Sequence, residues 1–160
     1  MNSTEPQSTS TVLSTMKIYP PLLAGALVLG TLALHFLLPE ERTVGWYPVI
    51  GLLVVAFGAG LSCFAAAIFQ ARGTTRNPYG EPTALVAQAP YTWTRNPMYL
   101  GVVTALLGMA IFFESIAMLL APAVFFAVID RMVIPREEET LQRLFGNDYV
   151  DYKNRVRRWI

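Results

Sequence analysis

The chain has 160 residues, of which 54% are hydrophobic and only 14% are charged, and its mean hydropathy is +0.43. This composition is typical of an integral membrane protein and argues against a soluble domain. The net charge is +1, so the overall charge gives no reason to expect a nucleic-acid partner.

The first 16 residues are polar and rich in serine and threonine. They have neither a basic segment at the start nor a small-residue cleavage site, so we interpret them as a disordered tail and not as a removable signal peptide. Residues 17–160 are then expected to form a single membrane domain.

Two uncharged runs follow, at residues 18–38 and 46–70, and each exceeds the roughly 20 residues that a helix needs to cross a bilayer. A third apolar region, residues 98–129, contains one charged residue, Glu114, and is too long for one helix. We expect a hairpin of two helices with its turn at "FFES", residues 112–115. Each arm has about 16 apolar residues, or ~24 Å, so the hairpin is short unless its second arm continues through "DRMVI". The expected fold is all-α and integral to the membrane, with about four transmembrane helices.

The basic residues are distributed unevenly between the ends of these runs. The segment between the first two runs has one arginine, residues 71–96 have three, and the tail from Asp130 has seven arginines and lysines. The positive-inside rule places the last two segments on the cytoplasmic side. With four crossings the N-terminus is cytoplasmic too, and we expect a protein of the prokaryotic inner membrane whose chemistry lies on its cytoplasmic face.

Small residues recur in the second run at Gly58, Ser62 and Ala66. This spacing lets helix backbones approach closely within a membrane bundle. No group of His, Cys, Asp or Glu has the spacing of a metal site, and the sequence has no glycine-rich phosphate loop. The spans are therefore expected to serve packing, and no metal is expected.

The segment "TRNPMYLG", residues 94–101, begins the third apolar region. Asn96 is a favoured N-cap residue and Pro97 suits the first helical position. The free N–H groups of a helix start favour an anion, and Arg95 adds a fixed positive charge beside them. Two interpretations follow: a site for a carboxylate or phosphate, or a contact with lipid headgroups.

The C-terminal tail combines acidic and aromatic residues. Pro135 opens a helix whose first turn carries three glutamates, residues 137–139, and Gly146 is placed to end it. A second helix puts Tyr149 and Tyr152 on one face. The glutamates compensate the helix dipole, or they bind a cation. A ligand with both a cationic centre and a carboxylate, such as S-adenosylmethionine, would fit between them and the arginine of "TRNP".

Two blocks of this half resemble the isoprenylcysteine carboxyl methyltransferase and phospholipid methyltransferase superfamily. "GTTRNPYGEPTALVAQAPYTWTRNPMYLG" is similar to its central block, N-P, L-V, G-P-Y and R-N-P-M-Y-x-G. "EEETLQRLFGNDYVDYKNRVRRW" is similar to its C-terminal block, which contains E-E, F-G-x-x-Y-x-x-Y and R-W. Ala89 replaces the usual glycine before P-Y, and Thr92 replaces the arginine often found after it. The resemblance covers residues 73–159, and the short chain looks like the small prokaryotic members.

The resemblance implies an integral-membrane methyltransferase whose S-adenosylmethionine pocket is built from these two blocks and covered by the C-terminal helices. Arg95 and Glu138 are the residues expected to carry the activity. Arg95 would hold one end of the cofactor, and Glu138 with Glu137 its cationic or ribose portion, while Tyr91 could pack on the adenine. The residues expected to bind the cofactor are Tyr91, Arg95, Asn96, Pro97, Tyr99, Gly101, Glu137, Glu138 and Tyr149.

The implied methyl acceptor is lipidic or prenylated and enters from the bilayer. Carboxyl methylation of an isoprenylcysteine-like substrate follows most directly from the resemblance. A carboxylate acceptor needs no general base, and no residue of the sequence stands out as one. Two other functions stay open at this point: a nicotinamide-dependent membrane reductase of the sterol reductase type, and a non-catalytic membrane scaffold.

Overall fold

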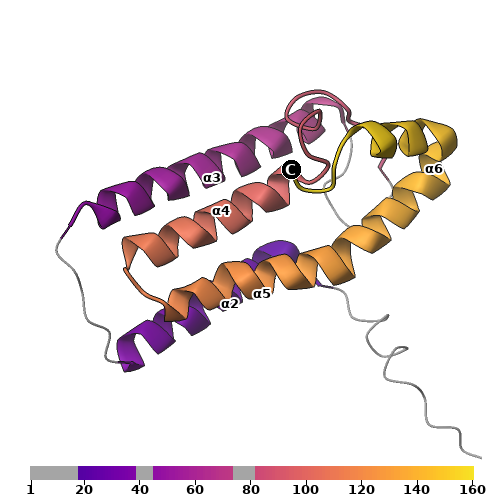
Figure 1. The fold of residues 1–160 in the computed structure, drawn as a ribbon. Coiled ribbons are helices and arrows are strands. Elements are labelled where there is room, and N and C mark those ends of the chain that lie inside the picture. The colour runs from indigo at the N-terminus through magenta and orange to yellow at the C-terminus, as the bar shows by residue number, and fades with distance from the viewer. Residues whose placement is uncertain (1–17, 39–44, 74–81) are drawn as a thin grey trace, which may run out of the picture.

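The fold is known from a computed structural model, which describes residues 18–38, 45–73 and 82–160. The expected disordered tail and the two segments that carry Arg42 and Arg76 lie outside the described residues. All regular structure in the described part is helical, which confirms the expected all-α class. Figure 1 shows two pairs of helices, α3 beside α4 and α2 beside α5, with α6 extending beyond them.

The first two apolar runs form the two expected helices. They are α2, Pro20–Leu37, and α3, Tyr47–Ala71. Both begin with a proline in the first turn, where the missing N–H costs no hydrogen bond. Both are long and apolar enough to cross a membrane.

The third apolar region forms the expected hairpin, but its arms differ in length. The first arm is α4, Pro97–Phe112, a shorter apolar helix of 16 residues. The chain then turns at Glu114, whose φ of 51° lies in the left-handed region that few non-glycine residues adopt. The turn therefore lies within "FFES", as predicted.

The second arm does continue through "DRMVI". The short 3₁₀ helix Ala117–Leu119 leads into α5, Leu120–Val128, then into a π-helical turn, Ile129–Val133, and directly into α6, Ile134–Arg155. Pro135 lies in the first turn of α6, but it does not start a separate helix, because the π-helical turn before it is continuous with α6. This continuous arm is the third helix long enough to cross a membrane.

Glycine allows α3 and α4 to pack with their backbones in contact. A Cβ atom on Gly58 would lie 2.5 Å from the Ala105 nitrogen, and one on Gly101 would lie 2.5 Å from the Gly58 carbonyl oxygen. Further along the same two helices, Gly51 and Gly108 face each other in the same way. This confirms the close approach predicted from the small residues of the second run.

Helix α6 folds back on itself at Gly146, which has φ 52° and ψ −124° within an otherwise helical segment. The second half of α6 brings the C-terminus next to the start of α4 (Figure 1). Tyr149 and Tyr152 are buried there against Ala65 and Val86. The tyrosine face therefore docks on the membrane helices and closes a cavity at one end of the bundle.

Candidate functional site

A cavity lies where the segment before α4, the two halves of α6 and the end of α3 meet. Its wall combines charged groups near the helix start with apolar and aromatic side chains. The residues that line it are Phe69, Pro82, Ala84, Leu85, Val86, Tyr91, Arg95, Asn96, Pro97, Met98, Tyr99, Ile134, Glu137, Glu138, Thr140, Leu141, Tyr149 and Tyr152.

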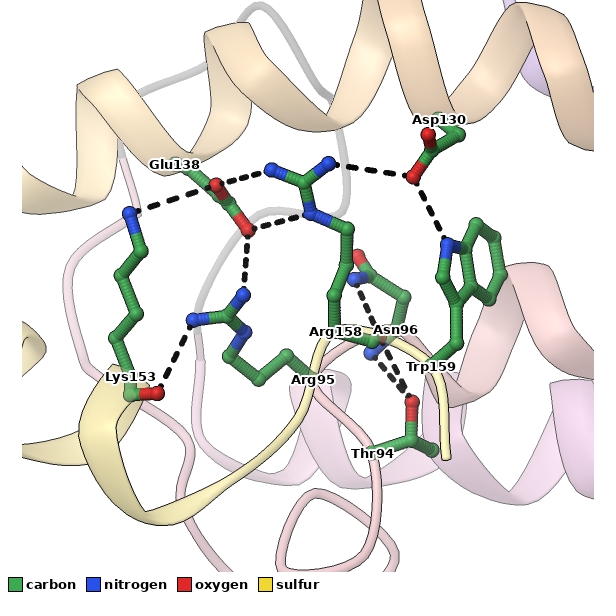
Figure 2. A network of polar contacts seen from close by, with 8 residues as sticks. All are labelled: Thr94, Arg95, Asn96, Asp130, Glu138, Lys153, Arg158 and Trp159. Carbon is green, nitrogen blue, oxygen red and sulfur yellow. Dashed lines mark hydrogen bonds and ion pairs between the residues drawn. The ribbon is translucent and has the colours of Figure 1, made fainter.

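Glu138, which lines the cavity, lies at the centre of an ion-pair cluster (Figure 2). One of its carboxylate oxygens is 3.0 Å from Nη2 of Arg95. The guanidinium of Arg158 binds the carboxylate with both Nε and Nη2, at 3.1 and 2.8 Å, and Nζ of Lys153 is 3.8 Å away. Since only 11% of the Glu138 side chain is exposed, these three cations replace its hydration.

A second carboxylate extends the cluster to the π-helical turn. Asp130 accepts a hydrogen bond from Nη1 of Arg158 at 3.3 Å and another from the indole Nε1 of Trp159 at 2.9 Å. Arg158 therefore bridges two acidic residues on consecutive helical segments, and its pKa is raised, first by the hydrogen bond to Glu138. The charged groups of this cluster hold the C-terminal residues against α6.

The backbone also ties the C-terminus to the segment before α4. The Arg95 N–H donates to the Arg157 carbonyl at 3.0 Å, and the Thr94 hydroxyl donates to the Arg158 carbonyl at 3.1 Å. Asn96 occupies the N-cap position of α4, but its side chain makes no capping bond. Its Nδ2 instead donates to the Arg158 carbonyl at 2.9 Å. Asn96 is therefore at the predicted N-cap position, but the capping hydrogen bond is absent, because its amide is oriented towards the carbonyl of the C-terminal segment.

Glu137 has a very different environment from its neighbour Glu138. Its Oε1 accepts a hydrogen bond from the Tyr99 hydroxyl at 2.7 Å. Among the described residues, no arginine or lysine pairs with it. Glu137 belongs to the charged part of α6, which follows the apolar part of the continuous arm. Desolvation by burial is the main cause that raises the pKa of Glu137 to about 7. The hydrogen bond from Tyr99 lowers this pKa, and the negative charge of Glu138 raises it by a smaller amount.

Aromatic rings form the opposite part of the wall. The Tyr91 ring lies 5.2 Å from that of Phe69, and its hydroxyl donates to the Ala65 carbonyl at 3.3 Å. The Tyr152 hydroxyl donates in turn to the Tyr91 carbonyl at 2.8 Å. Both tyrosines are therefore fixed by hydrogen bonds as well as by packing, and they present a rigid apolar surface to the cavity.

Of the nine residues expected to bind a cofactor, eight line this cavity and Gly101 does not. Gly101 faces Gly58 and Ser62 across the contact between α3 and α4, where no side chain fits. Gly101 was expected to bind the cofactor together with the other eight, but it lies outside the lining of this cavity. The "G" of "RNPMYLG" serves helix packing.

Sequence reasoning missed the residues that fix Glu138 and the C-terminus. Arg158 and Trp159 form the "RW" at the end of the C-terminal block, so the motif contained a signal that was not used. Asp130 was read only as the end of the apolar region, although a charged residue there needs a partner. Lys153 carried no signal beyond its charge.

The arrangement has the chemistry of a site for a ligand with mixed charge. An arginine and a helix start suit an anionic group, Glu137 suits a cation, and the aromatic wall suits a planar ring. In the part of the chain that the structure describes, no group of His, Cys, Asp and Glu could hold a metal ion.

Comparisons with known proteins agree on one group of enzymes. The model of the phospholipid methyltransferase family matches residues 46–148. Protein-S-isoprenylcysteine O-methyltransferase of Homo sapiens is 30% identical over 122 residues, and that of Mus musculus is 31% identical over 128 residues. Each match takes in 74% of this chain but 42% of the relative, so the chain spans less than half the length of these curated relatives.

An uncharacterized protein of Haemophilus influenzae is 36% identical over 63 residues, which is 39% of this chain and the whole of that protein. No solved structure matches the chain at a significant level.

Proposed function

Because the chain belongs to the phospholipid methyltransferase family, we propose that it is an integral-membrane methyltransferase that binds S-adenosylmethionine in the cavity at the start of α4. The observation that carries the proposal is the position of Arg95, Glu137 and the aromatic wall around one cavity. This is the site that the two sequence blocks build together.

The donor set of the cavity fits the proposed cofactor. The Nε of Arg95 is buried and has no hydrogen-bond acceptor among the described residues. A buried donor without a partner is costly, and the Arg95 side chain lines the cavity in which the ligand carboxylate would lie. Glu137 offers a carboxylate to a cationic group, and Tyr91 with Phe69 offers a surface for a purine ring.

The sulfonium of S-adenosylmethionine supplies an activated methyl group, so the protein mainly has to bind and align the reactants. Arg95 and the N–H groups at the start of α4 would hold the anionic end, and Glu137 the cationic part. Glu138 is engaged by three cations, so its role is to orient Arg95. The tyrosines that close the cavity would exclude water from the reacting groups.

The acceptor is proposed to be lipidic, with the carboxylate of a prenylated cysteine as the first candidate because of the names of the human and mouse relatives. The helices α2, α3 and α5 carry many exposed large apolar side chains, as expected of surfaces in contact with lipid. An acceptor with a long apolar chain would reach the cavity from that environment. The cavity is proposed to face the cytoplasm, because the segments around it hold most of the basic residues.

Titration of the purified protein with S-adenosylmethionine and, separately, with NADPH tests the proposal. We expect calorimetric binding of S-adenosylmethionine and none of NADPH. Binding of NADPH alone would favour a reductase, and binding of neither would favour a scaffold.

Arg95→Lys sharpens the titration, because lysine keeps the charge and loses the planar fork of donors. We expect the affinity for S-adenosylmethionine to fall at least about tenfold, or ~1.4 kcal/mol. The matched control is Arg157→Lys, since Arg157 is exposed and lies outside the cavity. Equal affinities of the wild type and Arg95→Lys would contradict the assignment of Arg95 to the ligand.

A further inference from the structure

Two adjacent carboxylates of α6 differ in the charges that surround them. Glu138 faces Arg95, Arg158 and Lys153. Glu137 faces the cavity and the Tyr99 hydroxyl, and no cation of the described residues pairs with it. One carboxylate is therefore neutralised by the protein itself, while the other lacks a counterion until a ligand brings one.

We propose that Glu137 is a proton-exchanging counterion, which holds a proton in the ligand-free protein and releases it when the cationic part of a ligand enters the cavity. The inference rests on the proposed function and adds to it a coupling between ligand binding and proton release. It also assigns different roles to the two glutamates that the sequence presents as a pair.

The surroundings of Glu137 support the protonated state in the absence of a ligand. Its burial and the negative charge of Glu138 disfavour ionisation, and the single hydrogen bond from Tyr99 does not offset them, so the pKa is raised to about 7. The cavity residues that come from α3 and from residues 82–86 are apolar. The charged or titratable groups that line the cavity with Glu137 are Tyr91, Arg95, Tyr99, Glu138, Tyr149 and Tyr152.

Arg95 pairs with Glu138, which lies 3.0 Å from its Nη2, and no cation contributes to the raised pKa of Glu137. A ligand with a sulfonium or an ammonium group differs from Arg95 in that it brings an uncompensated positive charge. Such a charge next to Glu137 favours the carboxylate and lowers its pKa. The proton on a Glu137 oxygen then leaves to the solvent, and the ligand and the carboxylate form an ion pair.

The direction of the pH dependence follows from this exchange. Below pH 7 the ligand-free protein holds the proton, so binding of a cation must displace it. The affinity for the cation therefore rises as the pH rises towards about 7 and levels off above it. At pH 6.5 a group with a pKa of about 7 is roughly three-quarters protonated, so we expect up to ~0.7 proton to be released per bound ligand.

Calorimetry measures this release directly. S-adenosylmethionine is titrated into the full-length protein at pH 6.5 in two buffers with different ionisation enthalpies, and the difference in heat gives the number of protons. We expect ~0.7 proton for the wild type and for Glu139→Gln, and close to none for Glu137→Gln. Glu139 is the matched control, because it is the next residue, is exposed and lies outside this cavity.

S-adenosylhomocysteine, which keeps the ammonium and lacks the sulfonium, identifies the cation. If both ligands cause proton release, the ammonium is the cation that pairs with Glu137. If only S-adenosylmethionine causes it, the sulfonium is that cation.

Each failure has its own signature. Binding to the wild type without proton release overturns the inference and leaves the proposed function standing, as does equal release from Glu137→Gln. Absence of binding overturns both. If Glu137→Gln binds too weakly for calorimetry, infrared difference spectra of the wild type decide the question. The band of a protonated carboxyl group must be present at pH 6.5 without ligand and disappear on binding, and a spectrum without such a band overturns the inference.

Discussion

Two regions join the same helical bundle by opposite means. One is the contact between α3 and α4. The other is the polar junction, which consists of Arg95, Asp130, Glu138 and Arg158 with the C-terminal residues. At the first, Gly58 and Gly101 remove side chains so that backbones touch. At the second, long charged side chains span the space between segments far apart in sequence (Figure 2). The first contact depends on shape, and the second depends on charge balance.

This difference determines how each region responds to substitution. A backbone contact fails when any atom is added, whatever its polarity, because neither helix can move without losing the other contacts along the interface. The polar junction tolerates changes in volume but fails when the charge of Glu138 is removed, because the largely buried Arg95 then stays without compensation.

The largest effect is expected at the polar junction from Glu138→Gln. The substitution keeps the volume but removes the carboxylate that pairs with the largely buried Arg95, while Arg158 keeps its ion pair with Asp130. Removal of one partner of a buried pair typically costs about 3–5 kcal/mol, and we expect a matching fall in thermal stability in detergent without ligand. Glu139→Gln is exposed and should stay within about 0.5 kcal/mol of the wild type.

Normal stability of Glu138→Gln together with weaker binding of S-adenosylmethionine would reverse this assignment. Glu138 would then be a ligand-binding group, and the polar junction would contribute little to the fold.

The next effect is expected at the contact between α3 and α4 from Gly58→Ala. The new methyl group would lie 2.5 Å from the Ala105 nitrogen and 2.6 Å from the Gly101 oxygen, both backbone atoms that cannot rotate away. Overpacking of this kind typically costs about 1–3 kcal/mol. Gly60→Ala, on the same helix, meets nothing within 4 Å and should leave the unfolding temperature unchanged or slightly higher.

If Gly58→Ala and Gly60→Ala unfold at the same temperature, the two helices do not pack at backbone distance. The contrast with the polar junction would then disappear.

The helices and their contact were predictable because they depend on local patterns. Uninterrupted apolar length predicts α2 and α3, and the spacing of small residues predicts the face on which α3 packs. The break at Gly146 was also predictable, since only glycine adopts its backbone angles readily. The π-helical turn was not, because the sequence there differs little from an ordinary helix.

The site was predictable only as far as its motifs extend. Arg95 and Glu138 stand out in their blocks, but their pairing depends on how α6 folds back, which no local pattern encodes. Arg158 joins α6 to the C-terminus through Asp130 and Glu138, and each of these contacts is long-range. For the same reason the side chain of Asn96 was assigned to its own helix, although it binds the carbonyl of a residue 62 positions away.

The smallest effect tests whether the polar junction extends to Asn96. As an N-cap acceptor, Asn96 could be replaced by aspartate at no cost, because both are favoured there. If Asn96 instead donates to the Arg158 carbonyl, 2.9 Å away, replacement by aspartate is costly. A carboxylate has no N–H and would face another oxygen. We expect Asn96→Ala and Asn96→Asp to lose about 1 kcal/mol each in thermal unfolding, with Asn154→Asp, an exposed position on α6, as the control. A loss in the alanine variant alone would return Asn96 to the helix cap and limit the polar junction to its charged residues.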